Sequence, residues 1–395
     1  MVFILTSIAW IILVGLLFSA FFKKMKLPGL VGFILAGILL GPNVLNVMDD
    51  NLLLISEDLR QMALIVILFR AGLTLDIHDL KKNGRPAFFL AFLPATFEML
   101  TVTMIAPIIF GINLLEAAIL GAVLGAVSPA VVVPRMIYLI EEGYGKEKGI
   151  PQMILAGASV DDIYVIVLFT SLVGMFQGNG FDFIGLILIP ISILMGILIG
   201  YGVGYLLTLF FKKFHLRDTI KVFILFSVCF LLVSVENSLK GILPFSGLIA
   251  VMAVGLSHRK YANDLANRLN EKFTKIWLVA EIFLFVLVGS EMNISVLKDT
   301  GLWGVLIIVT ALVFRLMGVI VSLLGTNLNN KERLFTAGAY TPKATVQAAI
   351  GSIPLALGIP SGDLILTIAV LSILITAPLG ALFIDRFYPK FLEAK

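Results

Sequence analysis

Residues 158–164 read ASVDDIY and lie inside the apolar stretch MILAGASVDDIYVIVLFTSLVGMF at residues 153–176. Asp161 and Asp162 are the only charged residues of that stretch. At the rise of an α-helix it is long enough to cross a hydrocarbon core of roughly 30 Å. One carboxylate at the centre of such a helix costs about 2.5–3.5 kcal/mol on insertion scales. Two adjacent carboxylates therefore predict a function inside the membrane.

The composition of the whole chain is that of a membrane protein. Of 395 residues, 59% are hydrophobic and 14% are charged, and the mean hydropathy is +1.06. Soluble domains hold about 25% charged residues, so an ordinary soluble protein is excluded. The single cysteine, Cys229, rules out a disulfide within the chain. The net charge of +4 gives no sign of a nucleic-acid partner, because the basic residues mark the sidedness of the membrane spans.

The apolar runs predict an all-α polytopic protein with about thirteen transmembrane helices. Each run is about twice the length of a membrane β-strand, which excludes strands. The first is too long for the core of a signal peptide and is expected to remain as an anchor. The runs lie at residues 2–22, 29–48, 55–75, 86–110, 115–139, 152–176, 183–211, 220–237, 241–257, 276–293, 302–324, 332–354 and 362–385.

The distribution of lysine and arginine predicts the orientation. Most of the 29 basic residues follow odd-numbered spans, whereas the loops and span ends after even-numbered spans hold Arg60, Lys240 and Lys298. By the positive-inside rule the N-terminus lies outside and the C-terminus is cytoplasmic. We expect the membrane to be the inner membrane of a prokaryotic cell.

An internal repeat predicts an inverted architecture. AGLTLDIHDLKKNG at residues 71–84 aligns with VGSEMNISVLKDTG at residues 288–301, at an offset of 217. The spans before these stretches are seven spans apart, an odd number, so the two copies cross the membrane in opposite directions. Inverted repeats are typical of secondary transporters, which bind substrate at the midplane between the copies.

The repeat brings further residues into correspondence. At the same offset Glu98 corresponds to Arg315, each near the centre of its span. At a slightly shorter offset SPAVVV at residues 128–133 corresponds to TPKATV at residues 341–346, with a proline in mid-span in both. Proline breaks a helix, and helices broken at matched positions indicate a transporter's binding site. A simple kink is the alternative for each proline.

The aspartate pair, the charged residues Glu98, Arg315 and Lys343, and the break at Ser128 are expected at one depth in the membrane. Together they predict a cation site. A carboxylate in a low-dielectric cavity binds either a proton or a small alkali cation, and that competition is sufficient for coupled exchange. Carboxylate, hydroxyl and carbonyl oxygens suit sodium or lithium, and no His or Cys cluster suggests a transition metal. The alternatives are a structural salt-bridge network for the aspartates and a mainly structural ion pair for Glu98 and Arg315.

At this point the sequence resembles a known family. LPGLVGFILAGILLGPN (27–43), LFRAGLTLD (68–76), SPAVVVP (128–134), ASVDDI and TPKATVQAAIG (341–351) are similar to segments of the monovalent cation/proton antiporter superfamily. The likeness is greatest to its sodium/proton branch with paired aspartates, which includes the NHA-type exchangers. The resemblance covers nearly the whole chain, and the aspartate pair and TPKATVQAA are its most specific parts.

The resemblance implies a homodimer of thirteen-helix protomers that work by an elevator-like movement. A scaffold and dimerisation domain would comprise residues 1–84 and 217–300, joined by a linker helix at 182–216 to a mobile core at 85–181 and 301–387, with a short tail at 388–395. It also implies that Asp162 binds the cation or the proton, with Asp161 beside it and no cofactor besides the transported ions. Ser128, Thr341 and Lys343 would support the site.

Arg315 stands where some paired-aspartate antiporters have a lysine, which bears on the stoichiometry. An arginine stays protonated at any accessible pH and does not couple a second proton. We therefore expect electroneutral exchange, with Lys343 as a fixed charge.

Competing interpretations are a potassium/proton antiporter of the same fold and a channel or sensor without coupled exchange. An enzyme is disfavoured because no catalytic motif appears. Arg70 is expected to be structural or snorkelling, and Glu281 and Glu291 to be solvated at the interfaces.

Overall fold

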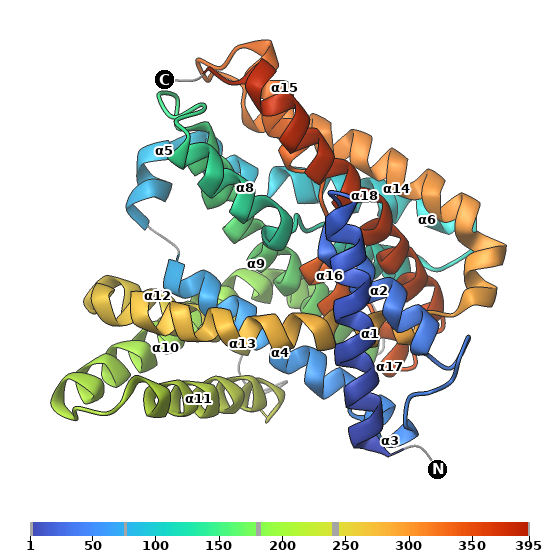
Figure 1. The fold of residues 1–395 in the computed structure, drawn as a ribbon. Coiled ribbons are helices and arrows are strands. Elements are labelled where there is room, and N and C mark those ends of the chain that lie inside the picture. Colours follow the sequence, from blue (N-terminus) through green and yellow to red (C-terminus); the bar gives the residue numbers. More distant parts are fainter. Residues whose placement is uncertain (1–2, 75–76, 179–182, 239–244, 394–395) are drawn as a thin grey trace. The chain divides into compact units, whose positions relative to one another are not determined.

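The computed structural model describes residues 3–74, 77–178, 183–238 and 245–393, and Figure 1 traces them as a chain of helices. No β-strand occurs in these ranges. Nine helical stretches among them are long and apolar enough to cross a membrane, and two shorter apolar helices accompany them. The prediction of an all-α polytopic protein is confirmed, and the count of thirteen spans stays a prediction. Lys240 and the last two residues of the tail lie outside the described ranges.

The described residues form two compact units. The first comprises residues 1–57, 77–173 and 282–395, and the second comprises residues 58–76 and 174–281. The helices, in chain order, are α1 (Ile4–Lys24), α2 (Gly29–Leu40), α3 (Asp50–Leu54), α4 (Ser56–Thr74), α5 (Ile77–Leu90), α6 (Leu93–Phe110), α7 (Leu114–Leu124), α8 (Pro129–Glu141), α9 (Ile150–Gln177), α10 (Phe183–Lys213), α11 (Asp218–Ser238), α12 (Gly247–Tyr261), α13 (Asn263–Ser290), α14 (Ile294–Ser322), α15 (Asn330–Ala339), α16 (Thr345–Ile350), α17 (Ile353–Ala356) and α18 (Gly362–Phe391).

Both helix breaks that the prolines predict are present. The span at 115–139 is divided into α7 and α8, and helix resumes at Pro129, where proline is tolerated because it occupies the first turn. The span at 332–354 is divided into α15 and α16, with Tyr340–Ala344 between them. The two breaks touch, because the Ser128 N–H donates to the carbonyl of Pro342 at 2.8 Å.

The two interrupted helices begin with the same cap. Asn113 accepts from the Glu116 N–H ahead of α7, and Asn329 accepts from the Glu332 N–H ahead of α15. Such caps satisfy amide groups that lack a partner within the helix. Helix therefore starts at Leu114 and Asn330, and at Pro129 and Thr345 after the breaks. Both pairs differ by 216 positions, whereas alignment of the two prolines uses a shorter offset.

Each repeated stretch contains the end of one helix and the start of the next. The first holds the end of α4 and the start of α5, and the second holds the end of α13 and the start of α14. The helices α5 and α14 begin at Ile77 and Ile294, 217 positions apart. The copies then differ. α14 continues to Ser322, whereas the first copy is interrupted at Gly84, whose φ of 49° suits glycine, and again before α6 begins at Leu93.

Several predicted span boundaries are wrong by more than four residues. The span at 29–48 ends as helix at Leu40, because Gly41 is extended and Pro42 follows it. The spans at 276–293 and 302–324 begin earlier, at Asn263 and Ile294. The extra turns are polar. Hydropathy detects the apolar part of a helix, whereas helical hydrogen bonding continues into water.

Two ion pairs hold the ends of the interrupted helices within the first unit. Arg135 of α8 binds both carboxylate oxygens of Asp385 on α18, at 2.8 and 2.9 Å. Lys148, in the loop before α9, binds the buried Glu332 of α15 at 2.8 and 3.0 Å. The hydrogen bond to Glu332 raises the pKa of Lys148. The half-helix α8 is thereby tied to α18, and the half-helix α15 to the loop before α9.

The helices α6 and α14 pack closely side by side (Figure 1), and Gly318 permits that approach. A Cβ atom at Gly318 would lie 2.8 Å from Cα of Pro94 and 3.0 Å from the carbonyl oxygen of Leu93. Both atoms belong to the backbone of α6 and have no side-chain freedom with which to move aside. Gly318 lies one turn beyond Arg315 on α14. The close approach that it permits therefore fixes how far Arg315 lies from α6.

We expect Gly318→Ala to destabilise the protein by about 1–3 kcal/mol, the usual cost of an overpacked interface. Gly301→Ala on the same helix is the matched control, because its Cβ would meet nothing closer than 3.5 Å. The control should be neutral or stabilising, since alanine is about 1 kcal/mol better than glycine in a helix. Thermal unfolding of both purified variants measures the difference. Equal stability of the two would contradict the close approach.

Candidate functional site

Two helices and both helix breaks of the first unit converge on Arg315 of α14. Its guanidinium donates to Oε2 of Glu98 at 2.8 Å and to Oδ2 of Asp161 at 3.0 Å. It also donates from Nε to the carbonyl of Tyr340 at 2.7 Å and to the carbonyl of Gly125. The side chains of Arg315, Glu98 and Asp161 are fully buried. The fork of the arginine thus links α6, α9 and both helix breaks.

Lys343 supplies the second buried cation from the break between α15 and α16. Its ammonium lies 2.7 and 2.8 Å from the two carboxylate oxygens of Glu98, and it also donates to the carbonyl of Leu124. The backbone N–H of Lys343 donates to Oγ1 of Thr376 on α18 at 2.9 Å. A buried charge is tolerated only when it is paired and hydrogen-bonded, and Lys343 meets both conditions.

The carbonyl groups at the end of α7 are occupied by side chains of other helices. Those of Leu124 and Gly125 accept from Lys343 and Arg315, and that of Ala126 accepts from Nε2 of Gln347 at 2.9 Å. The carboxyl end of a helix carries partial negative charge, which two cations stabilise. The broken backbone is therefore satisfied by the protein itself.

Asp161 and Asp162 have different surroundings. Oδ2 of Asp161 accepts from the Val127 N–H at 2.8 Å and from Arg315, which fixes this carboxylate to a helix break and to a permanent cation. Within the described residues no hydrogen bond or ion pair reaches the side chain of Asp162. Its exposed fraction is 8%, against 0% for Asp161. Asp162 is thus a nearly buried carboxylate without a side-chain partner among the described residues.

The other expected site residues lie at the breaks. Ser128 is fully buried, and its hydroxyl has no hydrogen-bond partner among the described residues. Thr341 is half-buried and donates to the carbonyl of Gly338 at 2.8 Å, so its hydroxyl completes the end of α15. The structure brings Glu98, Asp161, Arg315 and Lys343 together in one cluster. It joins Ser128 to them through the contact between the two breaks.

Three further charged residues were predicted to have structural or interfacial roles outside the site. Arg70 is half-buried on α4, in the second unit. Glu291 follows α13 and accepts a hydrogen bond from the hydroxyl of Ser56, so it has a structural contact in addition to its position near the surface. Glu281 is half-buried on α13. None of the three contacts the cluster around Arg315 among the described interactions.

Sequence reasoning missed several residues that build the cluster. Gln347 was quoted within TPKATVQAA without a role, although a buried amide in an apolar helix is itself a signal. Tyr340 lies with its ring 5.9 Å from the guanidinium carbon of Arg315. Thr376 was hidden in an apolar run of α18. The contact of Lys343 with Glu98 was also missed, because the repeat aligns Glu98 with Arg315 alone.

Comparison with known proteins identifies the family. The family model described as "Sodium/hydrogen exchanger, transmembrane" matches residues 8–387. The chain belongs to the sodium/hydrogen exchanger family. It is 35% identical to human sodium/hydrogen exchanger 9B2, over 93% of this chain and 70% of that protein. It is 34% identical to human sodium/hydrogen exchanger 9B1, over 85% of this chain and 67% of that protein.

Membership of the sodium/hydrogen exchanger family agrees with the fold. The chain is similar to the sodium proton antiporter MjNhaP1 from Methanocaldococcus jannaschii, with a TM-score of 0.85 over 97% of each chain and 21% identity. The protein is therefore a multi-pass membrane transporter rather than an enzyme. Sodium ions and protons are the substrates of this family and not cofactors. The resemblance to cation/proton antiporters is confirmed.

Proposed function

We propose that this exchanger moves one sodium or lithium ion against one proton, with Asp162 as the carboxylate for which the two compete. The observation that carries the proposal is the contrast between the paired Asp161 and the unpaired Asp162. A carboxylate without a cationic partner can be neutralised by a proton or by an alkali cation. Binding of the cation requires loss of the proton, which couples the two movements.

The charges around Asp162 support a ratio of one to one. Arg315 and Lys343 carry two positive charges, and Glu98 and Asp161 carry two negative charges. The cluster is therefore neutral before Asp162 is counted. Arg315 cannot release a proton, and Lys343 is held by both oxygens of Glu98. Asp162 then alternates between one proton and one cation, and the loaded site has the same charge in both cases.

Alternating access is proposed to follow an elevator-like movement of the core at residues 85–181 and 301–387, within a homodimer. The contact of two helix breaks at one point supports a site that is carried by the core. Almost all of the core lies in one compact unit, which also includes residues 1–57 and 282–300. The starts of α7 and α15, and those of α8 and α16, are separated by the same number of residues, which supports an inverted repeat. The distribution of basic residues supports an outside N-terminus and a cytoplasmic C-terminus.

Voltage-clamped exchange tests the proposed stoichiometry. The purified protein is placed in liposomes whose membrane potential is fixed with potassium and valinomycin, and a pH-sensitive dye records proton movement when sodium or lithium is added. We expect the initial rate and the final proton gradient to be independent of the imposed potential. Liposomes without protein give the background. A rate or gradient that follows the potential would show that a second group titrates and would refute the ratio.

A further inference from the structure

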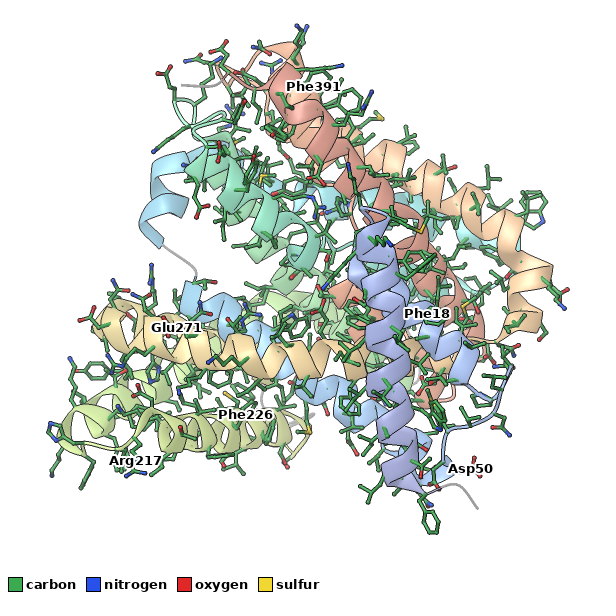
Figure 2. The ribbon with its side chains drawn as sticks, viewed as in Figure 1. Phe18, Asp50, Arg217, Phe226, Glu271 and Phe391 are labelled. Atoms are coloured by element: carbon green, nitrogen blue, oxygen red, sulfur yellow. The ribbon has the colours of Figure 1, made fainter. Side chains whose placement is uncertain are left out.

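One helix of the first unit, α18, packs against all four halves of the two interrupted helices. It runs from Gly362 to Phe391, which Figure 2 labels at the last turn. Its neighbours are α7 and α8 on either side of the first break, and α15 and α16 on either side of the second. None of the residues that the sequence predicted for the site belongs to this helix. A helix that contacts both interrupted helices is placed to fix the geometry of their breaks.

Thr376 of α18 supplies a hydrogen-bond acceptor to the second break. Its Oγ1 accepts from the backbone N–H of Lys343 at 2.9 Å, and both residues are buried. Lys343 lies between α15 and α16, where the hydrogen bonds of the helix are interrupted. A buried N–H is costly without an acceptor. Thr376 therefore holds the backbone from which the ammonium of Lys343 reaches Glu98.

Gly380 lies four residues after Thr376, on the same side of α18, and contacts the same break. A Cβ atom at Gly380 would lie 2.8 Å from Cδ of Pro342 and 2.9 Å from Oγ1 of Thr341. The ring of Pro342 is closed onto the backbone, so it cannot move aside without moving the break. The carbonyl of Pro342 in turn accepts from the Ser128 N–H at 2.8 Å. The contact of α18 with the second break is thus passed on to the first.

The first break is also bonded to the aspartate pair. The Val127 N–H, next to Ser128 in the chain, donates to Asp161 at 2.8 Å, and Asp161 precedes Asp162 on α9. A cation site must hold several oxygen ligands within about 0.5 Å of the productive geometry, whereas a proton binds a single carboxylate oxygen. A displaced break would therefore weaken binding of the cation more than binding of the proton.

We propose that Thr376 is a positioning residue for cation binding, and that it acts through the backbone of Lys343 at the second break. Gly380 gives α18 the close approach that this contact requires. Thr376 does not touch the cation. It keeps the two breaks in register, and the breaks keep the oxygen atoms around Asp162 in place. This inference rests on the proposed exchange at Asp162, and it adds to that site a helix that carries none of its charges.

Exchange rates in proteoliposomes at several sodium concentrations and one fixed pH test the role of Thr376. Thr376→Val keeps the branched shape of the side chain and removes the acceptor. We expect the sodium KM to rise about tenfold, the effect of one buried hydrogen bond, and the maximal rate to stay within about twofold of the wild type. Loss of folded protein alone would lower the maximal rate and leave KM unchanged. Thr376→Ser keeps the hydroxyl and should restore the sodium KM to within about twofold.

Thr367→Val is the matched control, because it makes the same change at a second buried threonine of α18. Thr367 lies about two and a half turns earlier, on the opposite side of the helix, and its hydroxyl has no hydrogen-bond partner among the described residues. Its sodium KM should stay within about twofold of the wild type. A wild-type KM in Thr376→Val, or an equal rise of KM in Thr376→Ser or Thr367→Val, would overturn the positioning role.

Gly380→Ala disturbs the same contact independently and serves as the test if Thr376→Val does not fold. The added methyl group displaces Pro342, so the sodium KM should rise by at least about fivefold. Gly301→Ala is its control, and thermal unfolding in detergent shows which variants are folded. A wild-type KM in Gly380→Ala would also overturn the proposal. Exchange by Asp162→Asn would refute the proposed function itself, whereas an inactive Asp162→Asn with a wild-type KM in Thr376→Val would refute only the positioning role.

Discussion

Replacing Asp162 with asparagine is expected to abolish sodium-driven proton movement while leaving the protein folded. Asparagine keeps the size of the side chain and removes the group that binds a proton or a cation. Asp162 has no side-chain partner among the described residues, so the change leaves no buried charge unpaired. We expect stability equal to that of the wild type or slightly higher, because a nearly buried carboxylate is itself costly. Dye-monitored exchange in proteoliposomes and thermal unfolding measure the two effects.

Asp299→Asn is the matched control for this prediction. Asp299 is exposed on α14, and its replacement makes the same chemical change outside the site. This variant should exchange at the wild-type rate. Sodium-dependent exchange near that rate in Asp162→Asn would end the proposal that Asp162 is the shared carboxylate. Failure of both variants to exchange would point to reconstitution rather than to the site.

Most of the fold was predictable because a membrane constrains it strongly. A chain in a bilayer must satisfy its backbone within each helix, so apolar runs longer than about 18 residues are themselves helices. Pro129 and Pro342 then located the two breaks, because proline removes a helical hydrogen bond and the two lie at matched positions of the repeat. Proline alone was not sufficient, since Pro134 and Pro378 lie inside α8 and α18. The polar first turns of α13 and α14 were not predictable in this way. Hydropathy does not distinguish a helix that enters water from a loop.

The charged members of the candidate site were predictable, whereas only one of their contacts was. Asp161, Glu98, Arg315 and Lys343 were identified because each is a charge inside an apolar span. The internal repeat suggested that Glu98 pairs with Arg315, and the structure contains that pair. The internal repeat gives no information about contacts between positions that it does not align, such as Arg315 with Asp161 or Lys343 with Glu98. Those contacts depend on how the breaks cross, which no single segment encodes.

The pairing in the structure changes what mutation of Arg315 should do. As an isolated pair, Glu98 and Arg315 could be replaced together by glutamines with recovery of much of the stability. In the structure Arg315 also binds Asp161 and the carbonyls of Tyr340 and Gly125, while Glu98 also binds Lys343. The double replacement leaves Asp161 and Lys343 with fewer opposite charges around them. We therefore expect little recovery.

Arg315→Ala should lower the free energy of unfolding by about 3–5 kcal/mol, the cost of removing one partner from a buried ion pair. Arg386→Ala, at an exposed position on α18, is the control and should cost no more than about 0.5 kcal/mol.

Two double-mutant cycles then measure the contacts of Arg315 with Glu98 and with Asp161 separately. One combines Arg315→Gln with Glu98→Gln, and the other combines Arg315→Gln with Asp161→Asn. Because Arg315 contacts both carboxylates, each cycle should give a coupling energy of about 0.5–3 kcal/mol. Coupling to Glu98 alone, measured by unfolding in detergent micelles, would restore the isolated pair and would contradict the contact of Arg315 with Asp161.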